Sequence, residues 1–320
     1  MSQMPLVIIP DDYQQATKQI QILYQNSDFE VVCLGALDRD PRAEELLSKA
    51  DALILIRERT LIDEKFLSKT PNLKLISQTG KVAYNIDLQL CKQRGIAVVE
   101  GAGSPVAAAE LAWLLIQSSI RRFVPSVEAM KKGQWQTELG DTVAGKTLGI
   151  IGYGKIGRLV AKYAQAFDMK VQVWGSTRAQ EQARQEGLIV PSCREAFFQT
   201  SDVVTLHQRL VKETTGGITF ADLTQMKSTA VFVNTARSGL VEARALEKAL
   251  DLGTPGFAAL DVFDIEPIWD NNHSLLKRDN VLCSPHIGYV TKSCYDIYFE
   301  SAFKNVERYF CGDESHVINK

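Results

Sequence analysis

The sequence predicts an α/β protein of two domains, each built on a parallel β-sheet covered by helices. Strand-sized apolar runs alternate with helix-like segments along almost the whole chain, which is typical of parallel sheets. One strand passes through a glycine-rich segment near residue 152 into a helix, as in a Rossmann-type doubly wound sheet. The chain has 320 residues, more than a single core usually organises.

The composition excludes several classes of protein. Hydrophobic residues make up 45% and charged residues 23% of the chain, and the net charge is −2 with no basic block. These values are ordinary for a globular protein and indicate neither nucleic acid nor a membrane as partner. The longest apolar runs are strand-sized, and the N-terminal segment MSQMPLVIIPDD lacks the features of a signal peptide. We therefore expect a cytoplasmic enzyme.

The six cysteines are scattered, without a CxxC pair. In a reducing compartment such residues act as small apolar fillers. We expect neither a disulfide framework nor a metal site.

The first hundred residues predict a flavodoxin-like α/β domain. Buried strands are expected at Leu6–Ile9, Glu30–Leu34, Ala52–Ile56, Leu73–Ser77 and Ile96–Val99. Helices are expected at Asp12–Tyr24, Arg42–Lys49, Ile62–Ser68 and Asp87–Arg94.

A second α/β series follows a long apolar helix, Ala107–Arg121, and a loop over Lys132–Asp141. Its strands are expected at Thr147–Ile151, Lys170–Trp174, Asp202–Leu206, Ala230–Asn234, Gly256–Asp261 and Asn280–Cys283. Its helices are expected at Ile156–Phe167, Gln180–Glu186, Ala221–Met226 and Ala243–Leu252.

The last helix, Ser293–Phe310, comes after this second series and is free to return to the first domain. We therefore expect a substrate domain of residues 1–103 completed by 291–320, and a dinucleotide-binding domain of residues 104–290.

The segment GYGKIG carries the dinucleotide signal. Gly152, Gly154 and Gly157 lie directly between a strand and a helix. Gly152 permits the tight turn, Gly154 lets the backbone approach a pyrophosphate, and Gly157 lets the helix press against the strand. A glycine-rich turn without a ligand is the alternative, but the strand before and the helix after favour a phosphate at the helix N-terminus.

The end of the next strand indicates which cofactor is used. The position that often holds Asp or Glu for the adenosine ribose is Gly175, followed by Ser176, Thr177 and Arg178. No acid is present to bond the ribose hydroxyls or repel a 2′-phosphate, and a guanidinium is close. NADP(H) is therefore favoured, with NAD(H) as the alternative.

Only four histidines are present, which shortens the search for an acid–base group. His316 lies in the C-terminal tail, and His273 lies in a loop where capping or packing is expected. His207 and His286 each follow a strand, at the edge where open α/β sheets bind ligands. His207 is expected in the wall beside the cofactor, and His286 is the better acid–base candidate.

Two charged residues follow the strands before His286. Glu266, in ALDVFDIEP, is placed to orient a histidine and support its charged form. Arg237, in VNTARSG, can pair with a substrate carboxylate or polarise a carbonyl. Three successive strand ends thus offer Arg237, Glu266 and His286 to one cleft.

The segments GKTLGIIGYGKIG, VNTARSGLVE, LDVFDIEP and SPHIGYVT closely resemble the signatures of the D-isomer-specific 2-hydroxyacid dehydrogenases, over essentially the whole chain. The resemblance implies that Arg237 binds the 2-oxo or 2-hydroxy acid and that His286 carries the proton, tuned by Glu266. It implies that Asp261 contacts the nicotinamide carboxamide and that the enzyme is a homodimer.

Further residues are assigned to the two ligands. Backbone amides around Thr79–Val82 are implied to hold the substrate carboxylate, so that the substrate set is Thr79, Gly80, Lys81, Val82 and, as a suspected contributor, Arg57. The cofactor set is completed by Lys155, Ile156, Thr235, Ala236 and Gly288. Arg59 and Trp135 are also suspected contributors to the substrate pocket.

The chain departs from the family at two places. The family usually has His-x-Pro after the fourth strand, whereas this chain reads LHQRL, with Arg209 in place of the proline. The family's frequent acid at the ribose position is replaced by Gly175. Both changes lie beside the expected cofactor.

Three other classes of protein can contain a similar glycine-rich segment or fold. A short-chain dehydrogenase needs a Tyr-x-x-x-Lys pair, and no tyrosine has a lysine four residues on. A methyltransferase leaves Arg237, Glu266 and His286 without a purpose. A dinucleotide-sensing interaction protein, like the corepressors that share this fold, stays open, and turnover of a small 2-oxo acid would separate it from an enzyme.

Overall fold

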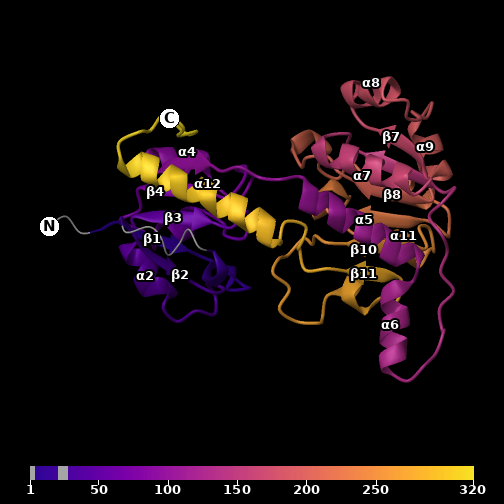
Figure 1. Ribbon diagram of the computed structural model, residues 1–320, viewed down its shortest axis with the longest axis horizontal. Coiled ribbons are helices and arrows are strands. Elements are labelled where there is room, and N and C mark those ends of the chain that lie inside the picture. Colours follow the sequence, from indigo (N-terminus) through magenta and orange to yellow (C-terminus); the bar gives the residue numbers. More distant parts are fainter. Residues whose placement is uncertain (1–3, 21–27) are drawn as a thin grey trace. The chain divides into compact units, whose positions relative to one another are not determined.

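The computed structural model describes residues 4–20 and 28–320 and divides into two compact units (Figure 1). One unit comprises Met1–Ser104 and Thr291–Lys320, and the other comprises Pro105–Val290. The chain leaves the first unit once and returns to it once, so the second unit is an insertion into the first.

The first unit contains a five-stranded parallel sheet in the order β2-β1-β3-β4-β5. This is the flavodoxin-like order that the sequence predicts. Each strand lies within two residues of its expected position. The strands are β1 (Leu6–Ile9), β2 (Glu30–Cys33), β3 (Ala52–Leu55), β4 (Leu75–Gln78) and β5 (Ala97–Glu100).

Helices cover this sheet on both faces. On one face Ile8, Leu53 and Ile76 pack with residues of α2 and α4 in a single apolar cluster. The other face is covered by α12, which packs on β3, β4 and β5 (Figure 1). The helices of this unit are α2 (Ala43–Lys49), α3 (Glu64–Leu67), α4 (Leu88–Gln93) and α12 (Lys292–Phe310).

The helix expected over Asp12–Tyr24 is not found where the structure describes that segment. Only a 3-10 turn, η1 (Ala16–Gln19), forms there, and residues 21–24 lie outside the described part. The buried Asp12 carboxylate accepts hydrogen bonds from the amides of Ala16 and Thr17. Gln15 has a φ of 52°, which a right-handed helix cannot contain. The prediction was therefore wrong over residues 12–20.

The second unit contains a six-stranded parallel sheet in the order β11-β10-β9-β8-β6-β7. From β7 the chain crosses back to the other side of β6, which creates a switch point between β6 and β8. In open α/β sheets, ligands bind at the carboxyl ends of the strands at such a point. The strands are β6 (Thr147–Ile151), β7 (Lys170–Trp174), β8 (Val203–Leu206), β9 (Val231–Asn234), β10 (Phe257–Leu260) and β11 (Val281–Cys283), all close to their expected positions.

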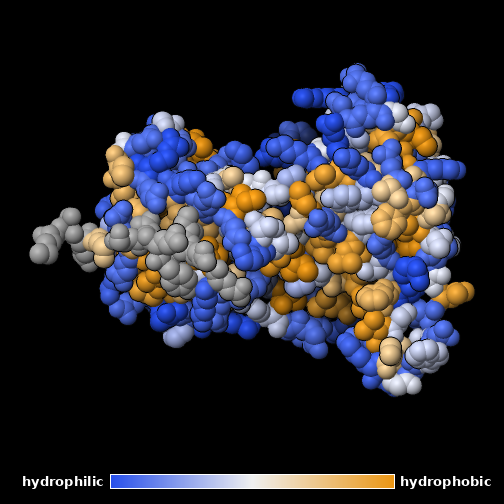
Figure 2. Space-filling model, in the orientation of Figure 1, coloured by the Kyte–Doolittle hydropathy of each residue, from blue (hydrophilic) through white to orange (hydrophobic). Residues whose placement is uncertain are grey.

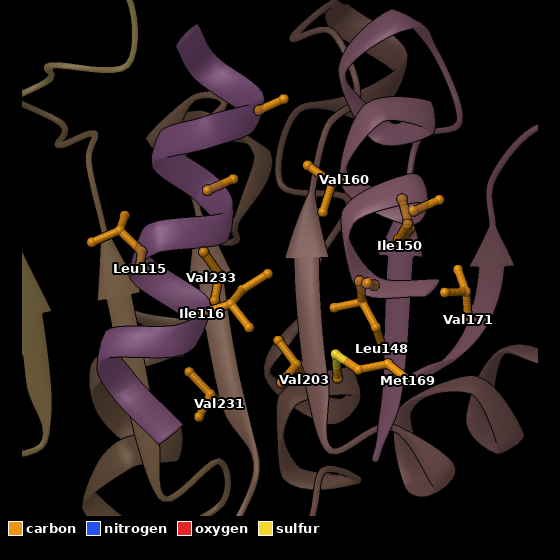
Figure 3. Packing of buried hydrophobic residues seen from close by; sticks show 14 of the residues in the cluster. Leu115, Ile116, Leu148, Ile150, Val160, Met169, Val171, Val203, Val231 and Val233 are labelled. Carbon is orange, nitrogen blue, oxygen red and sulfur yellow. The ribbon is translucent and has the colours of Figure 1, made fainter. Parts of the chain in front are cut away.

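Two apolar clusters cover the two faces of this sheet. Figure 3 shows α5 and α7 over one face, with Leu115 and Ile116 of α5 near Val231 and Val233 of β9. Helices α9, α10 and α11 contribute to the cluster on the other face. The helices of this unit are α5 (Val106–Ile120), α6 (Phe123–Lys131), α7 (Lys155–Ala166), α8 (Thr177–Gln185), α9 (Arg194–Thr200), α10 (Phe220–Thr224) and α11 (Ala245–Asp251). Short 3-10 turns occur at η2 (Lys212–Thr214), η3 (Ser238–Leu240) and η4 (Ser274–Lys277).

Helices α6 and α9 were not expected from the sequence. Pro125 lies in the first turn of α6, where a missing amide hydrogen costs little. None of the residues of α6 is buried, so its apolar positions Phe123, Val127 and Met130 take no part in the core of the unit.

Several features are absent from the part of the chain that the structure describes. No helix there is both long and apolar enough to cross a membrane. Nor do three or more His, Cys, Asp or Glu side chains gather there in a way that could hold a metal ion. All six cysteines are free thiols.

Candidate active site

The glycine-rich turn after β6 depends on three glycines with different roles. Gly152 has a φ of +93°, and a Cβ there would lie 2.6 Å from the backbone nitrogen of Gln208. A Cβ on Gly157 would lie 2.3 Å from the carbonyl oxygen of Gly152. Gly154, the N-cap of α7, has no atom within 4 Å of its Cβ position. The turn is therefore tight at both ends and open in the middle, where a pyrophosphate would approach the helix N-terminus.

The side chains next to this opening are arranged as expected for a cofactor site. Lys155 is exposed at the start of α7, and Ile156 packs against the apolar cluster beneath it. The residues present thus fit a dinucleotide: the cradle is free of side chains, and a cation lies beside it.

The segment after β7 would face the adenosine ribose. Ser176 caps α8 by accepting a hydrogen bond from the amide of Ala179, and Thr177 and Arg178 are exposed in the first turn. A Cβ on Gly175 would make ordinary contacts, 3.4 Å from the Cβ of Ala179 and 3.7 Å from the nitrogen of Gly152. The absence of an acid is therefore not forced by lack of space.

His207, after β8, is half-buried at the carboxyl end of the strand. Burial lowers the pKa of its imidazole to about 3, and its Nε2 lies 3.0 Å from the hydroxyl of Thr205. These surroundings disfavour the charged imidazolium. His273 caps η4 through its Nδ1, which accepts from the amide of Leu275, as its position in the sequence suggested.

His286 and Glu266 form a close pair at the ends of the adjacent strands β11 and β10. Nδ1 of His286 lies 2.5 Å from Oε2 of Glu266, and Nδ1 is the donor because a carboxylate only accepts. The other oxygen of Glu266 accepts from the amide of Phe263 at 2.7 Å. No hydrogen bond to Nε2 of His286 is found among the described residues, so this nitrogen can meet a ligand.

The loop that carries His286 is held by Asp261 at the end of β10. This side chain is fully buried. Its Oδ1 accepts from the hydroxyl of Ser284 and the amide of Ile287, and its Oδ2 accepts from the amide of Gly288. Burial raises the pKa of Asp261, and the three hydrogen bonds act in the opposite direction. Asp261 was expected to contact the cofactor; in this structure both carboxylate oxygens bind the loop.

Arg237 follows β9, in a turn that is also held by a buried polar side chain. The amide nitrogen of the Asn234 side chain donates to the carbonyl of Arg237 at 2.9 Å. The side-chain oxygen of Asn234 accepts from the amide of Ala236 at 3.0 Å. Thr235, Ala236 and Arg237 are half-buried in this turn. Because β9, β10 and β11 are parallel neighbours in the sheet, the segments that carry Arg237, Glu266 and His286 all begin at its carboxyl edge.

The expected substrate loop lies in the first unit, after β4. The amide of Thr79 donates to the carbonyl of Leu55, and the amide of Val82 donates to Oε1 of Glu100. The ammonium of Lys81 pairs with the other oxygen of Glu100. The amides of Thr79 and Val82 are therefore occupied, which narrows the expected carboxylate donors to the amides of Gly80 and Lys81.

Arg57 packs directly on this loop. Its backbone amide donates to the hydroxyl of Thr79, and its guanidinium lies so close to Gly80 that a Cβ there would be 2.0 Å from Nη1. Arg59, in contrast, has a structural role, because its guanidinium donates to the carbonyl of Asp11 and the hydroxyl of Tyr295.

Comparisons with known proteins decide the family. Residues 113–288 match the family model described as D-isomer specific 2-hydroxyacid dehydrogenase, NAD binding domain. A glyoxylate reductase from Thermococcus litoralis is 34% identical over 88% of this chain and 89% of its own length. The chain belongs to the D-isomer specific 2-hydroxyacid dehydrogenase family.

Solved structures agree with this membership. A putative D-3-phosphoglycerate dehydrogenase from Ralstonia solanacearum is 42% identical, with a TM-score of 0.93 over 98% of this chain and 96% of that one. A D-lactate dehydrogenase from Aquifex aeolicus, complexed with NAD and lactic acid, is 29% identical, with a TM-score of 0.78 over 98% and 99% of the two chains. The chain spans about half the length of two curated D-3-phosphoglycerate dehydrogenases that it matches, at 46% and 51%.

This 2-hydroxyacid dehydrogenase is thus an oxidoreductase that uses a nicotinamide dinucleotide. Two features of its site were not found from the sequence. The role of Asn234 could have been suspected, since a buried polar side chain at the end of an apolar strand needs a hydrogen-bond partner. The hydrogen bonds from the amides of Thr79 and Val82 could not have been predicted, because their acceptors, Leu55 and Glu100, are distant in the sequence.

One prediction concerns Asp261. In Asp261→Asn the amide group can accept on one side only, so at least one donor of the loop at 284–288 loses its acceptor. A buried unsatisfied donor costs about 1–3 kcal/mol. We expect kcat to fall with little change in cofactor KM, measured by steady-state kinetics. Ser284→Ala, which removes one donor and keeps both backbone bonds, should be milder. A raised cofactor KM with unchanged kcat would instead support the expected carboxamide contact.

Proposed function

We propose that this dehydrogenase reduces a small 2-oxo acid to the D-2-hydroxy acid, reversibly, with His286 as the acid–base group. The observation that carries the proposal is the 2.5 Å pair of His286 and Glu266 at the carboxyl edge of the dinucleotide-binding sheet. Glu266 fixes which nitrogen of His286 holds the proton, so that Nε2 can exchange one with the substrate oxygen. A bound nicotinamide cofactor supplies or accepts the hydride.

Arg237 is assigned to the substrate. Its guanidinium can pair with the substrate carboxylate and polarise the 2-oxo group, and Asn234 fixes the turn that presents it. The loop with Gly80 and Lys81, next to Arg57, is proposed to bind the carboxylate from the first unit. We accordingly propose that the first unit is the substrate domain and the second the cofactor domain.

A small substrate is supported by the relatives. One is named glyoxylate reductase, and a related solved structure holds lactic acid. A screen of glyoxylate, hydroxypyruvate, pyruvate and phenylpyruvate with both reduced cofactors tests the proposal. If no 2-oxo acid is turned over while the dinucleotide still binds, the alternative of a dinucleotide-sensing interaction protein would replace it.

The acid–base role of His286 gives a direct prediction. His286→Gln should lower turnover about 10²–10⁴-fold, the usual contribution of general acid–base catalysis, with cofactor affinity little changed. Turnover is measured by absorbance of the reduced cofactor, and affinity by titration of its fluorescence. His273→Gln is the matched control, because that histidine caps η4. Near-normal turnover in folded His286→Gln would rule the residue out.

Glu266 should set the pH dependence of reduction. Reduction needs protonated His286, and Glu266→Gln removes the carboxylate that stabilises the charged imidazolium. The protonated form then persists only at lower pH, so the falling limb of the pH–rate profile should move to lower pH. Glu266→Asp keeps the charge and should restore part of the shift. An unmoved profile would mean that Glu266 is only structural.

For the cofactor, we predict a higher kcat/KM with NADPH than with NADH. Arg178 can bind a 2′-phosphate, and a hydrogen bond to a charged group contributes about 1.5–3 kcal/mol, or on the order of tenfold to a hundredfold. Arg178→Ala should narrow the gap, and Gly175→Asp should improve the use of NADH, since a side chain fits at that position. Equal or better use of NADH by the wild type would contradict this prediction.

We also propose a homodimer, with α6 in the interface. Figure 2 shows hydrophobic side chains over α6. Phe123 and Met130 of this helix, and Trp135 and Leu139 after it, are exposed. A group of exposed large apolar side chains is typical of protein interfaces.

The dimer is tested by the mass of the protein in solution. Twice the chain mass of 35.6 kDa is expected by sedimentation equilibrium. Met130→Glu should shift the protein toward the monomer, because the interface would then bury an unpaired charge. Leu252→Glu, which introduces the same charge at another exposed apolar position, should leave the mass unchanged. A wild-type monomer would refute the proposal.

A further inference from the structure

Arg209 lies in the loop that follows β8, and the structure places this loop at the dinucleotide turn. A Cβ on Gly152 would touch the backbone of His207 and Gln208, at 2.7 and 2.6 Å. The loop that follows β8 therefore runs directly against the glycine-rich turn, and Arg209 is the next residue along it.

The backbone at Arg209 is fixed. Its carbonyl accepts a hydrogen bond of 2.7 Å from the hydroxyl of Thr214, which also accepts from the amide of Val211. The neighbouring Leu210 packs against the apolar cluster of that face, close to Gly239. The Arg209 side chain itself is exposed. The long cationic side chain of Arg209 is thus exposed on a backbone segment that hydrogen bonds and packing hold in place.

The order of the sheet puts two arginines on opposite sides of the turn. Strands β7, β6 and β8 are consecutive neighbours. Arg178 follows β7, the glycine-rich turn follows β6, and Arg209 follows β8. A Cβ on Gly175 would be 3.7 Å from the nitrogen of Gly152, so the loop after β7 also lies against the turn.

The charges around this turn are not compensated by acids. The three loops at 152–156, 175–178 and 207–211 contain no Asp or Glu. Among the described residues, Lys155, Arg178 and Arg209 form no ion pair, whereas Arg158 and Arg194 are paired with Glu186 and Asp222. Three cations that form no ion pair among the described residues thus belong to loops that lie at or against the glycine-rich turn, which favours a ligand with more negative charge than a pyrophosphate alone.

We propose that Arg209 is a second cation for the adenosine 2′-phosphate of NADP(H), acting with Arg178 from the other side of the ribose. The inference rests on the proposed preference for NADPH. A phosphate monoester carries about −1.5 to −2 charges at pH 7 and has three strong acceptor oxygens. It can therefore accept charge-assisted hydrogen bonds from two guanidinium groups at once.

The test compares two ligands that differ only by the 2′-phosphate, 2′,5′-ADP and 5′-AMP. Their dissociation constants are measured by calorimetry on the full chain, for the wild type and for Arg209→Ala, Arg178→Ala and Arg184→Ala. We expect Arg209→Ala to weaken 2′,5′-ADP about tenfold, the contribution of one charge-assisted hydrogen bond, and to leave 5′-AMP little changed. Arg184 lies at the other end of α8, so Arg184→Ala controls for the loss of one positive charge.

The outcomes separate this inference from the cofactor proposal. If the wild type binds both ligands equally, the predicted preference for NADPH is wrong, and so is the proposed role of Arg209. If the wild type prefers 2′,5′-ADP and only Arg178→Ala removes that preference, the role of Arg209 alone is wrong. If Arg209→Ala weakens the binding of 2′,5′-ADP and 5′-AMP equally, Arg209 contacts the part that the two ligands share and not the 2′-phosphate. That result would also overturn the inference.

Discussion

The loop that carries His286 depends on one buried carboxylate. Asp261 has no exposure to solvent and accepts hydrogen bonds from three donors of the loop that follows β11. A carboxylate is taken out of water at considerable cost unless such bonds compensate, so the loop and the carboxylate can only be stable together. Asn234 holds the turn with Arg237 in the same way. The strand ends thus fix the positions of His286, the proposed acid–base group, and of Arg237, the proposed substrate ligand.

The order of strands in the second unit divides the site into two halves. The ends of β7, β6 and β8 surround the glycine-rich turn, whereas the ends of β9, β10 and β11 carry Arg237, Glu266 and His286. A dinucleotide lying along this edge would have its adenosine at one half and its reactive end at the other. Parallel strands make this possible, because all their carboxyl ends meet at a single edge.

Much of the fold could be predicted from the sequence, since apolar runs and the glycine-rich segment report local structure. Family membership confirms the nicotinamide dinucleotide and the reaction class. The errors arise where side-chain hydrogen bonds and backbone conformation override the pattern of apolar residues. The Asp12 carboxylate and the left-handed Gln15 break the expected helix within residues 12–20. Glu100, which is distant in the sequence, accepts from the amide of Val82.

The insertion of one unit into the other has a consequence for synthesis of the protein. The second unit, Pro105–Val290, is contiguous and can fold as soon as it leaves the ribosome, since domains generally fold as units during translation. The first unit must wait for α12, its last element, which covers one face of β3, β4 and β5. Until then buried residues such as Ile54 and Val99 lack that cover. The first unit therefore begins to be translated before the second unit but is completed after it. Until α12 is added, the uncovered face of its sheet exposes apolar residues that favour aggregation.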